Sequence, residues 1–131
     1  MKKLNFDALQ SAIMQLEKGL QESSQHAENE LMRDGAIQRF EYTMDLAWKM
    51  MQRYLKSIQI EESVIRSKND IFREAARVKI IDNAESWISH YAARNETSHD
   101  YNTEKADLVY QQAKRFLPDV QQLLETLTRV A

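Results

Sequence analysis

The sequence has 131 residues and no cysteine, and its 18 Lys and Arg against 20 Asp and Glu give a formal charge of −2. The missing cysteines exclude disulfides, thiolate zinc sites and a thiol nucleophile, while the balanced charge excludes the strong positive field of non-specific nucleic-acid binders. The length predicts one domain over residues 1–131, and the absence of a long apolar run or a signal-peptide pattern predicts a soluble, cytoplasmic protein with no membrane partner.

Helix-favouring residues dominate the chain, which contains only two glycines and one proline. This composition favours helix almost everywhere and leaves few residues for hairpin turns. The first expected helix covers about residues 5–25, where apolar side chains recur every three or four positions. A polar turn is expected over residues 22–29.

A long second helix is predicted to follow, because apolar residues repeat at three-four spacing over 37–58. Its other face is also apolar, with Leu46, Met50 and Tyr54 widening the stripe. Packing against a single neighbouring helix does not require so wide an apolar face. We therefore expect this helix to be central or to share a subunit interface.

Residues 59–66 break the apolar period and are expected to form a loop. Ser67, followed three residues later by Asp70, resembles a helix start. The sequence therefore predicts a short third helix over residues 70–78.

Two more helices complete the expected set. Asp82 with Glu85 three positions on predicts the start of a helix that continues through Tyr91. From Thr103 the three-four repeat holds to the end of the chain, and Pro118 is expected to kink this last helix.

Three long helices and a shorter pair, joined by short connections, predict an all-α fold. We expect an antiparallel up-and-down four-helix bundle with an additional short helix. The cost of exposing the second apolar face of the long second helix also favours a homodimer.

A polar segment between two of the apolar helices holds the densest set of reactive groups. It contains Arg94, Asn95, Ser98, His99 and Tyr101. On a continuous helix these side chains would line one face. If the helix ends midway, a loop would instead bring the arginine and the histidine together from either side of a turn. The sequence leaves both arrangements open.

The chemistry of this segment suits a phosphodiester. Arginine offers forked donors matched to phosphate, and histidine transfers protons near neutral pH, so neither a metal nor another cofactor is required. The alternative is structural: Arg94 caps a helix end, His99 is a turn residue and Tyr101 packs at the rim of the core. Spacing alone favours this structural interpretation.

Three other groups have two interpretations each. Glu41 and Asp45, four apart on a helix, could share a metal, but a surface pair of Asp45 with Lys49 is the expected arrangement. His90 could assist Arg94, although a helix residue with a satisfied nitrogen is more common. Trp48 could stack on a nucleobase, but core packing is favoured at its helical position.

Two sequence features together resemble a known family. Arg94, His99 and Tyr101 form an Arg-x4-His-x-Tyr motif, and residues 39–49 read RFEYTMDLAWK. This combination resembles the HEPN domains known as nucleotidyltransferase substrate-binding subunits, and the likeness extends from the second helix through the last.

The resemblance implies a HEPN-like helical-bundle homodimer beside a separately encoded minimal nucleotidyltransferase, in a toxin–antitoxin arrangement. It implies a metal-independent ribonuclease that the partner silences by transferring AMP to Tyr101, with Ser98 beside it in the nucleotide site. Arg94 would hold the scissile phosphate of RNA, His99 would act as general acid or base, and Asn95 would orient them. The alternatives are a non-catalytic nucleotide-binding subunit and a structural adaptor.

Two departures from the family pattern bear on this expectation. Around residues 57–68 the chain lacks the glycine-containing turn of many relatives, which leaves a partner contact there open. Glu96 and Asp100 place negative charge beside the motif. RNA binding therefore needs compensation by Lys105, Arg115 or a partner surface.

Overall fold

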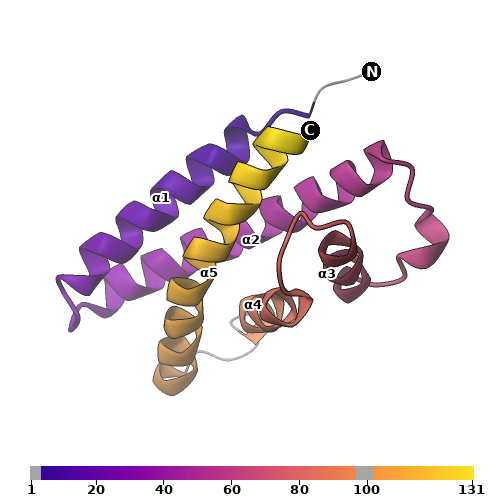
Figure 1. Cartoon of the computed structure of the whole chain (residues 1–131). Coiled ribbons are helices and arrows are strands. Elements are labelled where there is room, and N and C mark those ends of the chain that lie inside the picture. The colour runs from indigo at the N-terminus through magenta and orange to yellow at the C-terminus, as the bar shows by residue number, and fades with distance from the viewer. Residues whose placement is uncertain (1–3, 97–101) are drawn as a thin grey trace.

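The computed structural model describes residues 4–96 and 102–131, and every regular element in these two stretches is a helix. Three long helices run across the view in Figure 1, and two short helices are seen nearly end-on. The predicted all-α bundle is confirmed. The elements are α1 (Asp7–Ser24), α2 (Glu30–Ser57), the 3-10 turn η1 (Glu62–Val64), α3 (Lys68–Arg77), α4 (Ala84–Glu96) and α5 (Thr103–Val130).

The helix starts follow from side chains that cap exposed backbone N–H groups. Ser67 accepts from the backbone N–H of Asp70 at 3.3 Å, as the sequence indicated, so α3 begins at Lys68, two residues earlier than expected. Asn29 caps α2 and Asn102 caps α5 in the same way.

The predicted start of α4 is corrected by one residue. Asn83, not Asp82, accepts from the backbone N–H groups of Glu85 and Ser86, at 2.9 and 3.3 Å. Asp82 instead accepts from the side-chain amide of Gln122 on α5 at 2.7 Å. Asp82 thus has a partner on α5, and Asn83 is the cap.

Helix α2 is the central element and contacts α1, α3, α4 and α5. Its second apolar face is used within the chain, since Met50 is buried and Leu46 and Tyr54 pack against the core. This face therefore does not by itself require a second subunit. The central position that we expected for this helix is confirmed.

Helix α5 stays continuous through Pro118, and Figure 1 shows its axis changing direction along its length. Proline removes one backbone donor and crowds the preceding turn, so a bend is the expected response. Within the described part of the chain, no helix has the length and apolarity needed to cross a bilayer.

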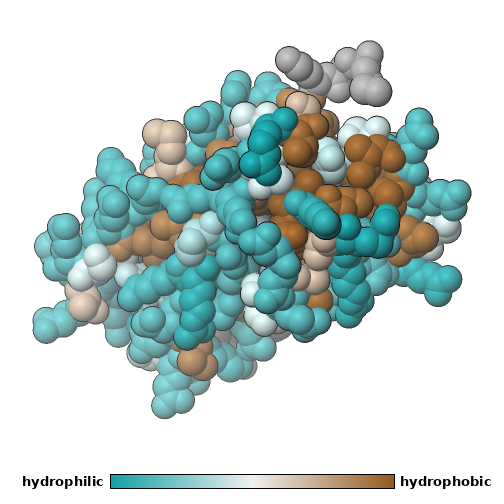
Figure 2. All heavy atoms as spheres, in the orientation of Figure 1, coloured by the Kyte–Doolittle hydropathy of each residue, from teal (hydrophilic) through white to brown (hydrophobic). Residues whose placement is uncertain are grey.

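Polar side chains cover most of the face shown in Figure 2, with apolar side chains gathered in a few patches. Most of the large apolar side chains are in the core, but some are exposed, among them Leu31 at 83 % and Tyr42 at 60 %. These two lie eleven residues apart on α2, so three helical turns place them on one stripe.

Candidate functional site

Arg94, in the last turn of α4, lies at the centre of an ion-pair cluster with two carboxylates of α2. Its Nε and Nη2 donate to the two oxygens of Asp45 at 3.0 and 3.1 Å, and its Nη1 donates to Glu41 at 3.0 Å. This bidentate geometry uses the fork of the guanidinium and fixes its plane. The side chain is 25 % exposed, so one part of it still faces solvent.

The cluster forms because Glu41 and Asp45 are one turn apart on α2 and α4 packs against that face. The hydrogen bonds to Asp45 raise the pKa of Arg94, burial opposes this rise, and the charges of Asp45 and Glu41 add to it. The guanidinium therefore stays charged, and the two carboxylates are occupied by it.

The surface pair predicted between Asp45 and Lys49 is wrong. Asp45 pairs with Arg94, and the Lys49 ammonium lies over the ring of Trp48, 5.7 Å from its centre. The sequence interpretation missed this because the two partners are 49 residues apart. The one available signal was the pair of carboxylates at i and i+4, which matched several structures equally well.

Of the five predicted site residues, the structure describes Arg94 and Asn95, at the end of α4. Asn95 is exposed and follows Arg94 directly on the helix. Ser98, His99 and Tyr101 lie outside the described residues. Their convergence with Arg94 therefore stays a prediction.

A lysine and two aromatic rings lie next to the Arg94 cluster. The Lys68 ammonium, on the first residue of α3, is 4.6 Å from the ring centre of Trp48 and 5.7 Å from that of Tyr91. Trp48 packs against the core, as expected, and its buried Nε1 has no hydrogen-bond partner among the described residues. The sequence interpretation did not single out Lys68.

His90 is a core residue rather than a companion of Arg94. It is 2 % exposed, with Nε2 2.6 Å from a carboxylate oxygen of Asp119 and Nδ1 2.8 Å from the amide nitrogen of Gln112. Its ring also packs edge-on against Trp87 and Phe116. Burial lowers the pKa of His90, and the hydrogen bond to Asp119 only partly opposes this shift. The ring is therefore neutral, donating from Nε2 and accepting at Nδ1.

The pattern of these helices and residues matches a family model described as nucleotidyltransferase substrate binding protein like, over residues 4–129. The match covers nearly the whole chain. The chain belongs to this nucleotidyltransferase substrate-binding family.

A curated protein and two solved structures are similar to this chain. A Haemophilus influenzae protein named "Probable ribonuclease HepT" is 36 % identical over 135 residues, which covers 95 % of this chain and 92 % of the relative. A solved Haemophilus influenzae structure, described as revealing the fold of a substrate binding domain of a nucleotidyltransferase, has a TM-score of 0.84 at 34 % identity. It covers 95 % of this chain and 99 % of its own. A Thermus thermophilus crystal structure gives 0.64 at 29 % identity, over 86 % of this chain and 98 % of its own.

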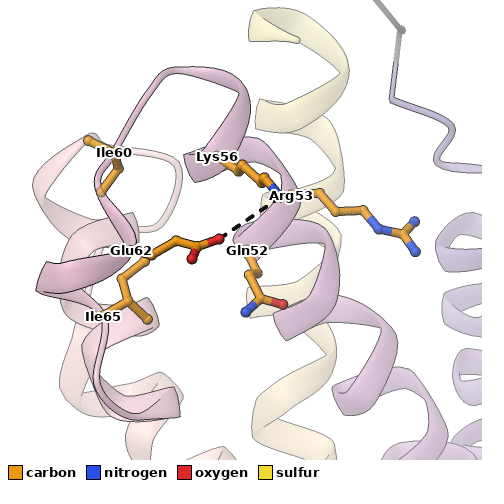
Figure 3. Close-up of a pocket in the computed structure, with 6 residues that line it drawn as sticks. All are labelled: Gln52, Arg53, Lys56, Ile60, Glu62 and Ile65. Carbon is orange, nitrogen blue, oxygen red and sulfur yellow. Dashed lines mark ion pairs between the residues drawn. The ribbon is translucent and has the colours of Figure 1, made fainter.

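This family member also has a cavity of about 530 Å³ beyond the Arg94 cluster, near the end of α2. Figure 3 shows Lys56 and Glu62 reaching toward each other across it, 3.9 Å apart, while Arg53 points away from Glu62. The remaining walls are Gln52, Ile60 and Ile65. Both charged groups of the pair are largely exposed, so this contact adds little stability.

The same region contains a strained backbone position. Gln59 has a φ of 67°, in the left-handed region that favours glycine. Gln59 lies in the turn that follows α2, before η1. A glutamine at this φ costs backbone strain that a glycine would not.

Proposed function

We propose that this family member is a HEPN subunit that cleaves RNA without a metal and is silenced by a separately encoded minimal nucleotidyltransferase. The name of the Haemophilus influenzae relative, "Probable ribonuclease HepT", supports the ribonuclease, and the family description supports an association with a nucleotidyltransferase. The arrangement of Arg94 supports the chemistry.

The single observation that carries the proposal is the fixed, partly exposed guanidinium of Arg94. A cation whose plane is already set by two carboxylates loses little entropy when it binds a phosphate. Its remaining solvent-facing part can approach a phosphate oxygen and stabilise the charge that develops there.

In the proposed reaction the 2′-hydroxyl of RNA loses its proton to a base and attacks the adjacent phosphorus. The bond to the 5′-oxygen breaks, that oxygen takes up a proton, and a 2′,3′-cyclic phosphate and a 5′-hydroxyl result. His99 moves one of these protons, Arg94 stabilises the phosphate, and Asn95 orients them. No step requires a metal.

Silencing is proposed to occur at Tyr101. Its hydroxyl gives up its proton to a base while its oxygen attacks the α-phosphorus of ATP held by the nucleotidyltransferase, with Ser98 in the nucleotide site, and pyrophosphate leaves. The new phosphodiester adds negative charge beside the RNA-binding arginine and so opposes binding of a second phosphate.

A second candidate function is a non-catalytic subunit that presents a nucleotide to its partner. It is favoured by the family description and by the Haemophilus influenzae structure described as a substrate binding domain of a nucleotidyltransferase. A structural adaptor is the third alternative, and it predicts neither cleavage nor nucleotide binding.

An RNA-cleavage assay distinguishes the ribonuclease from the two non-catalytic candidates. The purified chain is incubated with single-stranded RNA and EDTA, and the experiment is repeated with His99→Ala. We expect cutting by the natural chain and a loss of at least about 100-fold in the variant. Cutting that survives the substitution contradicts the mechanism, and no cutting by either protein favours the binding subunit.

We also propose that the chain acts in the cytoplasm as a homodimer. The support for a dimer is the exposed stripe of α2 that carries Leu31 and Tyr42. Large apolar side chains on one helical face are typical of a contact between subunits.

A further inference from the structure

The Arg94 cluster lacks positive charge for RNA. One guanidinium is paired with the two carboxylates of Glu41 and Asp45, so the cluster as a whole is negative. A phosphate that approaches Arg94 also approaches these carboxylates, and their repulsion offsets much of its attraction to the arginine. Binding of an RNA strand therefore requires another cation close by.

Lys68 occupies the position where such a cation is needed. Its ammonium lies over Trp48, one turn beyond Asp45 on α2, and near Tyr91, one turn before Arg94 on α4. One turn corresponds to about 5 Å along a helix axis. Three helices thus converge to place Lys68 beside the arginine cluster, although the two residues are far apart in the sequence.

The groups around Lys68 position its ammonium without neutralising its charge. Aromatic rings attract an ammonium through their faces and carry no net charge themselves. Within residues 4–96 and 102–131, no carboxylate forms an ion pair with Lys68. Lys68 is also half-buried at the start of α3, where the helix dipole adds positive potential.

We propose that Lys68 binds a backbone phosphate of single-stranded RNA, next to the phosphate held by Arg94. This rests on the proposed function as an RNA-binding subunit and adds a second phosphate contact to the same site. A strand presents neighbouring phosphates at regular intervals, so a second cation next to the Arg94 cluster can contact the phosphate beside the one that Arg94 holds. Trp48 and Tyr91 position the lysine and do not touch the RNA.

The test is binding of a fluorescent single-stranded RNA by anisotropy at several salt concentrations, in a His99→Ala background that leaves the RNA intact. Lys68→Gln is compared with Lys68→Arg and with Lys114→Gln. Lys114 is a matched control, because its ammonium also lies over a tyrosine ring, 4.7 Å from the centre of Tyr110, on a different part of the molecule. Circular dichroism checks that each variant folds.

We expect Lys68→Gln to raise the Kd about three- to tenfold, and to reduce the slope of log K against log salt by about 0.7. Lys68→Arg should retain most of the affinity, and Lys114→Gln should leave both values unchanged. A purely structural role for Lys68 would not change the salt slope. Equal effects of Lys68→Gln and Lys114→Gln overturn the proposal, as does a complete lack of RNA binding.

Comparison of cleavage with binding distinguishes a failure of this inference from a failure of the proposed ribonuclease. If the natural chain cuts RNA but Lys68→Gln binds it normally, Lys68 is not a phosphate ligand and the ribonuclease stands. If Lys68→Gln weakens RNA binding but the natural chain never cuts, the ribonuclease fails and the phosphate contact stands. Weakened binding of AMP with unchanged binding of RNA overturns the assignment to an RNA strand.

Discussion

Arg94 donates to both carboxylate oxygens of Asp45, and this pair joins the last turn of α4 to the middle of α2. The two residues are 49 positions apart in the sequence, and η1 and all of α3 lie between them. The arginine of the proposed site is thus held by the central helix of the bundle. We therefore expect substitutions of its partners on α2 to alter the orientation of Arg94 even though these residues do not contact the RNA.

The first prediction concerns this pair. Asp45→Asn keeps the shape of the side chain but loses its charge and one acceptor oxygen, so we expect about 1 kcal/mol less unfolding free energy, discounted for partial exposure. Glu41→Gln removes a single charged contact and should cost about half as much. Urea unfolding measures both. A larger effect of Glu41→Gln than of Asp45→Asn would show that the bidentate contact is not the stronger one.

His90 makes stability depend on pH. Because burial lowers its pKa in the folded protein, the unfolded chain takes up the proton first as the pH falls. The contribution of neutral His90 to the free energy of unfolding is fully present above its pKa in the unfolded chain, about 6.5. It is lost as the pH falls through the lower pKa of the folded protein. We expect less unfolding free energy at about pH 5.5 than at about pH 7.5.

The matched variants for this prediction are His90→Asn and His26→Gln. His90→Asn should flatten the pH dependence, whatever its own stability, because the buried titrating group is gone. His26→Gln is the control, because His26 is exposed in the turn before α2. An unaltered slope in His90→Asn would assign the pH dependence to another group.

Gln59 tests the strained turn after α2. Glycine adopts its φ of 67° without strain, although it also gains freedom in the unfolded chain, so Gln59→Gly should stabilise by about 0.5 kcal/mol. The control is Gln52→Gly, an exposed helical position where glycine should destabilise by about 1 kcal/mol. Thermal unfolding of both variants gives the comparison. If Gln59→Gly also destabilises, the glutamine side chain makes a contribution that outweighs the backbone strain.

The proposed homodimer is tested at the exposed stripe of α2. Tyr42→Glu places a charge on it and should shift the equilibrium toward monomer by tenfold or more, as measured by analytical ultracentrifugation. Val64→Glu serves as control, because Val64 is also an exposed apolar residue but lies in η1. A dimer that persists in Tyr42→Glu, or a natural chain that is monomeric at high concentration, contradicts this surface.

The sequence predicted the helices better than it predicted the site. Three-four spacing of apolar residues located the three long helices, because burial of one face is a local, periodic requirement, and capping signals located the two short ones. The cap of α4 was displaced by one residue, since Asp82 has a partner on α5 that no local pattern reveals. The wide apolar face of α2 was predicted, and the structure shows that neighbouring helices cover it.

The site depended on contacts between distant segments. The residue type of Arg94 and its spacing from His99 predict phosphate chemistry, and this stays a prediction. Its pairing with Asp45, and the placement of Lys68 over Trp48, arise only when α2, α3 and α4 pack together. The carboxylates at i and i+4 on α2 did not by themselves identify their partner, so the charge balance of the site could be judged only from the structure.

The most direct test of the central claim is cleavage of single-stranded RNA in EDTA by Arg94→Lys. Lysine keeps the positive charge but lacks the fork that Asp45 and Glu41 orient, so it cannot present a fixed plane to the phosphate. We expect the natural chain to cut, and Arg94→Lys to lose at least about 100-fold in kcat/KM while remaining folded. Cleavage by Arg94→Lys at the rate of the natural chain would contradict the account.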